Sequence, residues 1–124
     1  MPVSLFIISM KIQEVIIYLE CLAPPSYQES YDNSGLITGK PQNSVTGILV
    51  TLDCTEEVVQ EAIEKGANLI VAHHPVVFRG LKKLTGSTYV ERTVIKAIRH
   101  EIAIYAIHTN LDNVFNGVNH KICE

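Results

Sequence analysis

The sequence predicts an α/β fold of three layers, with helices on both faces of a mainly parallel sheet. Two observations predict it. Along residues 47–107, short apolar runs alternate with amphipathic segments in the order strand, helix, strand, helix, strand, which is typical of βαβαβ units with right-handed crossovers. The predicted strands are also apolar at nearly every position, as in sheets that are covered on both faces.

The first expected element is an amphipathic helix over residues 11–22. Apolar side chains recur along it at helical spacing, and two consecutive prolines end the run. Residues 26–44 that follow are rich in Ser, Asn, Asp, Gly and Pro. Because this composition is typical of turns, we expect a structured loop there.

The alternating part begins with a strand over residues 47–52. In the helix after it, Thr55 is the expected N-cap, acidic residues occupy the first turn, and Gly66 ends the helix. The remaining predicted elements are a strand over residues 68–72, a helix over residues 89–100 and a strand over residues 102–107.

Composition indicates one domain, which we place at residues 10–124. A chain of 124 residues that is 47% hydrophobic can bury a core without a structural metal, so any bound metal is expected to be functional. The three cysteines form no CxxC pair, which favours a reducing, cytoplasmic compartment. The net charge of −3 comes from scattered residues, and we therefore expect no direct contact with nucleic acid.

Residues 1–9 are interpreted as an extension of undefined role, with Met10 as an alternative start of the domain. The apolar run at residues 3–8 is far shorter than the roughly 20 residues of a membrane helix. It also lacks a basic start and a cleavage site, so we expect neither a membrane span nor a signal peptide.

Potential metal ligands or bases follow all three predicted strands. Asp53 follows the first, His73 and His74 follow the second, and His108 and Asp112 follow the third. The carboxyl ends of parallel strands lie at one edge of a sheet, where ligands bind in open α/β folds. We therefore expect these side chains to lie close together.

The adjacent histidines favour two metal ions over one. Successive side chains of an extended segment point to opposite sides, so His73 and His74 could each serve one ion of a pair about 3.5–4 Å apart. Asp112 would share a helical face with His108, four residues earlier, and its two oxygens make it the candidate bridging ligand. The mixed nitrogen and oxygen donors indicate Zn, Fe or Mn.

Several candidates have structural alternatives. His108 alone is either a site residue or a hydrogen-bonded turn residue. Asp53 is interpreted as the cap of the following helix, and Cys54 as a buried small hydrophobe rather than a nucleophile. His120 and Glu124 also have the spacing of a helical ligand pair, but we interpret them as exposed polar residues of a new helix.

Four motifs stand out as a set: YDNSGL at 31–36, TLDCT at 51–55, IVAHHPVVF at 70–78 and HTNLD at 108–112. The set resembles the amino-terminal half of the NGG-interacting-factor-three family, dinuclear metal-centre proteins also called GTP cyclohydrolase type 2 homologues. The resemblance implies that His73, His74 and Asp112 are metal ligands, with Asp112 shared, and that His108 lies in or beside the coordination sphere. It also implies an α/β fold assembled into toroidal homohexamers with the metal sites facing an internal cavity.

The same resemblance implies an incomplete ligand set. The family's remaining ligands, a His and a Glu four residues apart, come from a carboxyl-terminal half that this chain does not contain. By motif, His120 and Glu124 follow the Asp112 segment and do not replace that pair. Three explanations stay open: the chain is a fragment, another polypeptide completes the site, or the chain binds metal weakly.

Two main classes of function are expected. In the first, a metal-dependent hydrolase uses two divalent ions on a nucleotide-like substrate, as a cyclohydrolase or a phosphoesterase, and His108 positions water or moves a proton. In the second, the protein is a metal-binding scaffold or regulatory module without turnover. The family name suggests a third class, a transcription-linked interaction protein. Fold and motifs do not separate these classes.

Overall fold

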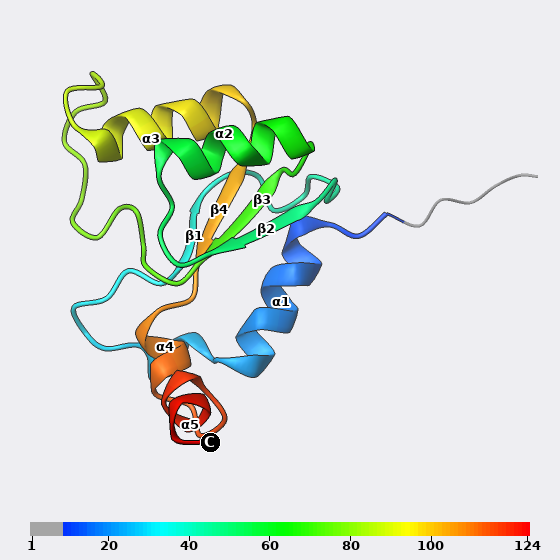
Figure 1. Cartoon of the computed structure of the whole chain (residues 1–124), viewed down its shortest axis with the longest axis vertical. Helices are drawn as coiled ribbons and strands as arrows, with labels where there is room; N and C mark the ends of the chain where they lie inside the picture. The colour runs from blue at the N-terminus through cyan, green and yellow to red at the C-terminus, as the bar shows by residue number, and fades with distance from the viewer. Residues whose placement is uncertain (1–8) are drawn as a thin grey trace, which may run out of the picture.

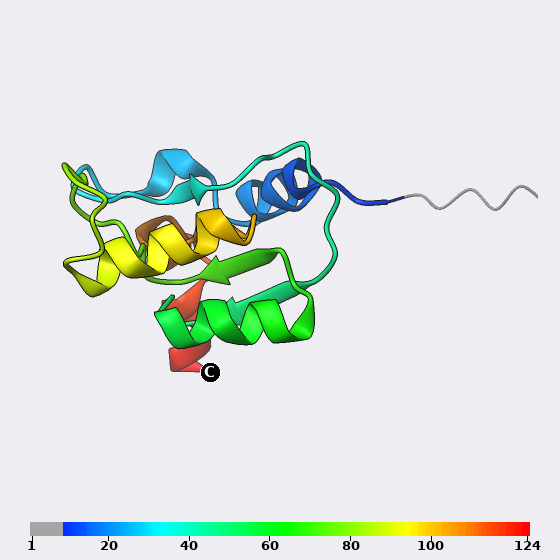
Figure 2. The same cartoon turned by 90° about the horizontal axis from the view of Figure 1, so that it is seen from above.

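The computed structural model describes residues 9–124 as a four-stranded mixed sheet with helices on both faces (Figures 1 and 2). The apolar run at residues 3–8 lies outside the described residues. The elements are α1 (Ile12–Leu22), a short helical turn η1 (Pro25–Tyr27), β1 (Gly35–Thr38), β2 (Ile48–Thr51), α2 (Glu56–Lys65), β3 (Leu69–Ala72), α3 (Tyr89–Arg99), β4 (Ala103–Ala106), α4 (Thr109–Asp112) and α5 (Val118–Cys123).

The parallel part of the sheet confirms the predicted βαβαβ order. Strand β3 pairs in parallel with β2 on one side and with β4 on the other, and helices α2 and α3 form the two crossovers. The N-cap of α2 is Thr55, whose side chain accepts a hydrogen bond from the Val58 backbone N–H, and Gly66 ends the helix in the left-handed conformation. Both ends of this helix agree with the sequence prediction.

Strand β1 was not predicted and corrects the loop expected over residues 26–44. It pairs antiparallel with β4, so the sheet order is β1-β4-β3-β2. The strand has only four residues, and glycines with φ of +111° and +115° stand at its start and just after its end. Its pairing partner lies about 70 positions later in the sequence (Gly35 pairs with Ala106). No local periodicity reports such a distant contact.

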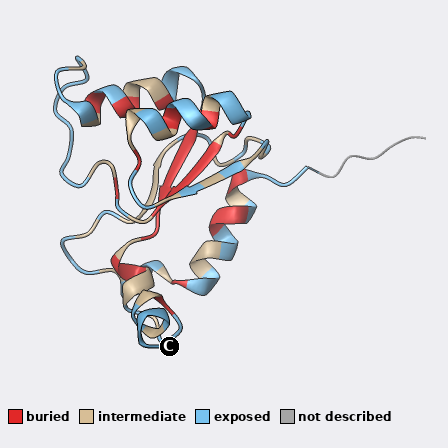
Figure 3. Cartoon of the chain, in the orientation of Figure 1, coloured by how far each residue is buried: buried red, intermediate tan, exposed pale blue. Residues whose placement is uncertain are grey.

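The core has two parts, one on each face of the sheet. Helix α1 covers one face and packs against β3 and β4, and α2 and α3 cover the other face. Figure 3 shows the buried residues gathered on β3, β4 and the inner sides of these helices. Helices α4 and α5 lie beyond the end of the sheet, below the strands in Figure 1.

Strand β2 departs from the expectation that helices cover every strand on both faces. Ile48 pairs with Leu69, and Val50 pairs with Val71, so the members of each pair share a face. Leu69 and Val71 are 0% and 7% exposed, whereas Ile48 and Val50 are 47% and 78% exposed. The layer formed by α1 therefore ends at β3, and β2 is an edge strand with one open apolar face.

The loop before α3 is fastened by the buried carboxylate of Glu91. This carboxylate accepts hydrogen bonds from the backbone N–H and hydroxyl of Thr85, from the hydroxyl of Ser87, and from the backbone N–H and hydroxyl of Thr88. The bond from the Thr85 backbone, together with those from Ser87 and Thr88, lowers the pKa of Glu91 to about 2. The start of α3 and the end of the preceding loop are thus one hydrogen-bonded unit.

No helix within residues 9–124 combines the length and the apolar character that crossing a membrane requires.

Candidate metal centre

Three histidines meet at the carboxyl ends of the central strands. His73 and His74 follow β3, and His108 lies between β4 and α4. One ring nitrogen from each lies within 4.8 Å of those of the other two, and the ring centroids are 5.0, 5.2 and 5.4 Å apart. We call these three residues the histidine cluster. The topology of parallel strands predicts their meeting, because neighbouring strands end at the same edge.

The two adjacent histidines converge, contrary to the expectation that they point to opposite sides. The backbone N–H groups of His73 and His74 still donate to the carbonyls of Thr51 and Leu52. The chain nevertheless bends at both residues before Pro75 and is no longer a strand. Alternation of side chains holds only for extended backbone, so the bend lets both rings reach one point.

Each ring of the cluster is oriented through its Nδ1 atom. The Nδ1 acceptors are the carbonyl oxygen of Ile107 at 2.9 Å for His73, Oδ1 of Asp53 at 2.7 Å for His74, and Oδ1 of Asp32 at 2.9 Å for His108. A carbonyl and an ionised carboxylate only accept hydrogen bonds, so each Nδ1 carries the proton. In a neutral ring of this tautomer, Nε2 keeps its lone pair. Metal-binding histidines are held in this same way, by a carbonyl or carboxylate on the second nitrogen.

Asp112 lies beside the cluster. Its Oδ1 is 3.6 Å from Nε2 of His73, the nitrogen that is left free. Two ligands of one tetrahedral zinc ion, each about 2 Å from the metal, are separated by about 3.3 Å. The distance between Asp112 and His73 is therefore suited to two ligands of one ion. The group of atoms within 4.8 Å of one another contains the three histidines but not Asp112.

The predicted helical turn after β4 is present. Helix α4 includes Asp112, whose backbone N–H donates to the carbonyl of His108. In this turn the Asp112 side chain approaches His73. The spacing of His108 and Asp112 thus places both residues at the site, as expected.

The interpretation of Asp53 as a helix cap is wrong. Thr55 caps α2, and the Asp53 carboxylate instead accepts the hydrogen bond from His74. The strand exits of β2 and β3 are neighbours, because the two strands are paired. Asp53 therefore belongs to the site as the residue that orients His74.

Asp32 is the site residue that sequence reasoning missed. Besides His108, its buried carboxylate accepts hydrogen bonds from the backbone N–H and hydroxyl of Thr109 and from the hydroxyl of Ser34. Burial by itself raises the pKa of Asp32, but the hydrogen bonds from Thr109, His108 and Ser34 hold that pKa well below its ordinary value. Asp32 is therefore a buried anion that fixes both the ring of His108 and the start of α4.

The sequence offered one signal for Asp32. It lies three residues before Gly35, which pairs with Ala106 of β4, two residues before His108. A prediction of that antiparallel pairing would have brought Asp32 to the cluster. Interpreted only as turn residues, positions 31–35 gave no reason to look there.

Two further predictions can be compared with the structure. Cys54 is buried, and burial raises its pKa to about 11, which confirms a small hydrophobe and argues against a nucleophile. His120 of α5 and Glu124, which follows that helix, pair with each other at 3.2 Å. They are not members of the histidine cluster.

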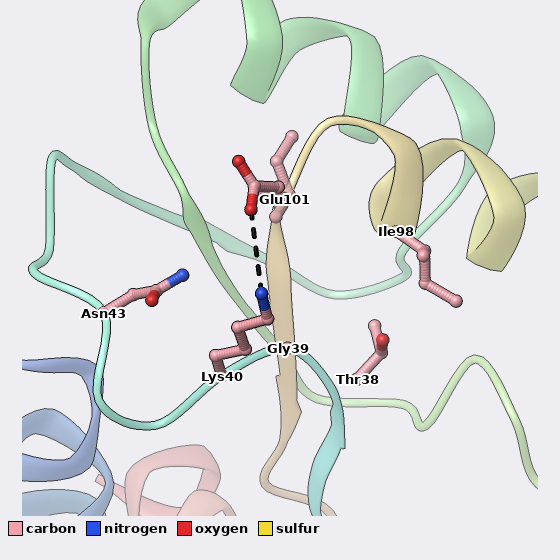
Figure 4. Close-up of a pocket in the computed structure, with 7 residues that line it drawn as sticks. Thr38, Gly39, Lys40, Asn43, Ile98 and Glu101 are labelled. Carbon is pink, nitrogen blue, oxygen red and sulfur yellow. Dashed lines mark ion pairs between the residues drawn. The ribbon is translucent and has the colours of Figure 1, made fainter.

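A cavity of about 350 Å³ lies at the opposite end of the sheet (Figure 4). It is next to the end of β1 and the start of β4, whereas the cluster follows the carboxyl end of β4. Lys40 and Glu101 face each other across it at 3.9 Å, and both side chains are largely exposed. Exposed pairs of this kind stabilise little, and the cavity contains no histidine or cysteine.

Comparison with known proteins identifies relatives along nearly the whole chain. A GTP cyclohydrolase 1 type 2 homolog from Clostridium perfringens is 43% identical over 115 residues, which are 93% of this chain and 44% of that protein. A Staphylococcus aureus hypothetical protein of known crystal structure is 45% identical with a TM-score of 0.88, over 94% of this chain and 38% of the other. A Bacillus cereus protein related to NIF3 is 39% identical with a TM-score of 0.86, over 92% and 31% of the two chains.

The chain thus spans less than half the length of these relatives. Residues 10–124 match the family described as Duf34/NIF3 (NGG1p interacting factor 3). This match covers every helix and strand of the structure. The resemblance drawn from the sequence motifs is therefore confirmed: the chain belongs to the Duf34/NIF3 family.

Proposed function

We propose that the chain binds divalent metal through His73, His74, His108 and Asp112, and acts as part of a metal-dependent hydrolase for a nucleotide-like substrate. One observation carries the metal proposal. Three imidazoles converge while each is held at Nδ1 by a carbonyl or carboxylate. In neutral rings held this way the lone pair is on Nε2, and one ring nitrogen of each histidine lies within 4.8 Å of the other two, as ligands of a shared cation would.

The charges of the site favour a bound cation. Protonation of all three rings would bring three positive charges together within a few ångströms, which is unfavourable. Neutral rings place one ring nitrogen of each histidine within 4.8 Å of the other two, a spacing that suits ligands of a shared cation. Because Asp112 adds a negative charge next to His73, the set is complementary to a divalent ion.

The donors favour a metal of intermediate softness. Imidazole nitrogen and carboxylate oxygen suit Zn, Fe or Mn, and the cluster in the described residues contains no thiolate. His108 lies nearly as close to its two neighbours as they lie to each other, which favours it as a ligand over a separate proton carrier. A pair of ions bridged by Asp112 is the arrangement that the family resemblance supports.

When bound, divalent ions supply Lewis acidity to a hydrolytic reaction. The chain's own residues then have defined tasks. Asp32 and Asp53 hold the rings of His108 and His74 in one tautomer and one orientation, and the Ile107 carbonyl does the same for His73. This orientation requires little rearrangement when substrate binds, which is the condition for efficient electrostatic catalysis.

The proposed substrate class is supported by the relatives, which are named GTP cyclohydrolase 1 type 2 homologs. One observation favours a second function. The His74 side chain is about half exposed, in a chain that spans less than half the length of its relatives. Such an open site also suits a metal-binding scaffold or regulatory module that operates within an oligomer. We propose a homohexamer and a cytoplasmic location on the family resemblance and the free cysteines.

The test is turnover of GTP by the zinc- or manganese-loaded chain, followed by nucleotide chromatography and phosphate release. The hydrolase proposal expects activity that Asp112→Ala abolishes while the circular dichroism spectrum is retained. His120→Ala is the matched control, because His120 pairs with Glu124 outside the cluster. Stoichiometric metal without turnover of GTP or a phosphodiester would favour the scaffold, and activity unchanged in Asp112→Ala would contradict the site.

A further inference from the structure

Two aromatic rings lie in series next to the histidine cluster. The Phe78 ring meets the His108 ring edge-on with centroids 6.4 Å apart, and the Tyr31 ring is 6.4 Å from that of Phe78. Tyr31 is 64% exposed and Phe78 is 45% exposed. The two rings come from different loops, one before β1 and one after β3.

Hydrogen bonds fix the loops that carry these rings. The side-chain amide of Asn33 donates to the carbonyl of Val77 at 2.6 Å, which ties the residue before Phe78 to the loop of Tyr31. Asp32, next to Tyr31, is bonded to His108 and Thr109. The backbone at both aromatic residues is therefore held in place although the rings face solvent. A fixed and exposed apolar surface beside a polar site is typical of a ligand-contacting surface.

Cationic residues follow Phe78 in the same loop. Arg79, Lys82 and Lys83 are exposed, and among residues 9–124 no carboxylate lies within ion-pair distance of any of them. Three basic side chains within five positions make this loop locally positive in a chain whose net charge is −3. Planar rings stack on aromatic side chains, and phosphates are attracted to Lys and Arg.

We propose that Tyr31 and Phe78 form a stacking surface for the planar heteroaromatic ring of an anionic small-molecule ligand. Arg79, Lys82 and Lys83 attract its phosphate groups. The proposal deepens the proposed function, on which it rests, because it assigns recognition of the ring and of the phosphates to separate residues beside the metal centre. It makes Tyr31 and Phe78 specificity-determining residues.

The test uses guanosine as the main probe, because it has the ring but no phosphate that could chelate metal. Binding to the full chain is measured by NMR titration, with and without EDTA. We expect Tyr31→Ala and Phe78→Leu each to weaken guanosine binding about tenfold, which corresponds to about 1.4 kcal/mol. Phe78→Tyr should retain binding, because it keeps a ring at that position. Tyr18→Ala is the control, since Tyr18 on α1 is also 64% exposed and takes part in no aromatic pair of the described residues.

Tripolyphosphate is the second probe and reports the cationic loop. The double variant Lys82→Ala, Lys83→Ala should weaken binding of tripolyphosphate and GTP but not of guanosine, whereas Tyr31→Ala should leave tripolyphosphate binding unchanged. Three results would overturn the proposal. These are a wild-type chain that binds no guanosine, a Tyr31→Ala variant that binds it as tightly as wild type does, and a Tyr18→Ala variant in which binding is weakened as much as in Tyr31→Ala. Loss of metal in Phe78→Leu would also overturn it, because Phe78 would then act by supporting His108. Tighter binding of a single-stranded oligonucleotide than of GTP would overturn it as well.

The two proposals fail separately. If no preparation binds metal or turns over GTP, the proposed function fails, while ring binding that depends on Tyr31 and Phe78 in EDTA still stands. If turnover is present and its KM for GTP is unchanged in Tyr31→Ala and Phe78→Leu, the stacking surface is wrong and the metal site remains.

Discussion

Asp32 and His108 are 76 positions apart in the sequence, yet Oδ1 of Asp32 accepts a hydrogen bond from Nδ1 of His108 at 2.9 Å. This contact crosses from the loop before β1 to the end of β4. It fixes the tautomer of His108 and leaves Nε2 free. The histidine cluster and the antiparallel edge of the sheet are therefore parts of one structure.

The first prediction concerns this contact. In Asp32→Asn, an amide NH₂ would replace one of the carboxylate oxygens that accept hydrogen bonds from His108, Thr109 and Ser34 in the wild type. We expect a loss of about 2–3 kcal/mol in the free energy of unfolding, measured with urea in EDTA, and a weaker affinity for Zn²⁺. The control for stability is Asp53→Asn, because the Asp53 side chain is largely exposed and bonds to His74 alone. Equal stability of Asp32→Asn and wild type would contradict the account.

The second prediction concerns acid stability. The pKa of Glu91 is lowered to about 2 in the folded state, from the ordinary value of 4.5 for a Glu carboxyl. A group whose folded pKa is depressed stabilises the fold above its unfolded pKa, and that contribution is lost as the pH falls toward the folded pKa. Glu91→Gln should therefore lower stability at pH 6 and flatten the decline between pH 4.5 and pH 2, the window between the two pKa values.

The measurement is the free energy of unfolding from urea titrations across that range of pH. Glu64→Gln serves as the control, since Glu64 is exposed and bonds only to the side chain of Gln60. A slope in Glu91→Gln that equals the wild-type slope would show that the Glu91 network does not contribute to acid sensitivity.

The third prediction concerns the unpredicted strand. A Cβ at Gly39 would lie 2.4 Å from Cβ of Ala103, and the φ of Gly39 is +115°. Gly39→Ala should therefore destabilise the protein by about 3 kcal/mol, through backbone strain and overpacking together. Gly80→Ala is the matched control, because nothing lies within 4 Å of its added Cβ. If thermal or urea unfolding shows the two variants to be equally stable, the packing of β1 against β4 is wrong.

The fourth prediction concerns thiol reactivity. Cys21 and Cys123 are exposed, and Cys54 is buried with its pKa raised to about 11. Because the thiolate is the reactive form, Ellman's reagent should titrate two thiols rapidly in the native protein and three in denaturant. Cys54→Ala should give two under both conditions. Rapid reaction of three thiols in native wild type would contradict the burial of Cys54.

The sequence predicted those parts of the fold that depend on local pattern. The helices and the parallel strands came within about one residue of their observed ends, because apolar spacing, the Thr55 cap and Gly66 are local signals. The meeting of His73, His74 and His108 followed from topology, since paired parallel strands end at one edge.

The missed features all depend on contacts between distant segments. The pairing of strand β1 and the hydrogen bonds of Asp32 form only when residues 31–38 lie against residues 104–109. Asp53 looked like a cap because its nearest neighbours in sequence begin a helix, whereas its partner His74 follows another strand. The convergence of His73 and His74 depends on a bend of the backbone at these two residues, which their residue types did not indicate.

Binding of a divalent cation by His73, His74 and His108 underlies each function proposed for this chain. The direct measurement is metal content by inductively coupled plasma mass spectrometry after loading with Zn²⁺ and dialysis. Wild type and the control His120→Ala should each retain at least about one zinc per chain, and the double variant His73→Ala, His74→Ala should retain almost none while keeping its circular dichroism spectrum. Wild-type protein that retains no stoichiometric metal, or a double variant that retains as much as wild type, would contradict the claim.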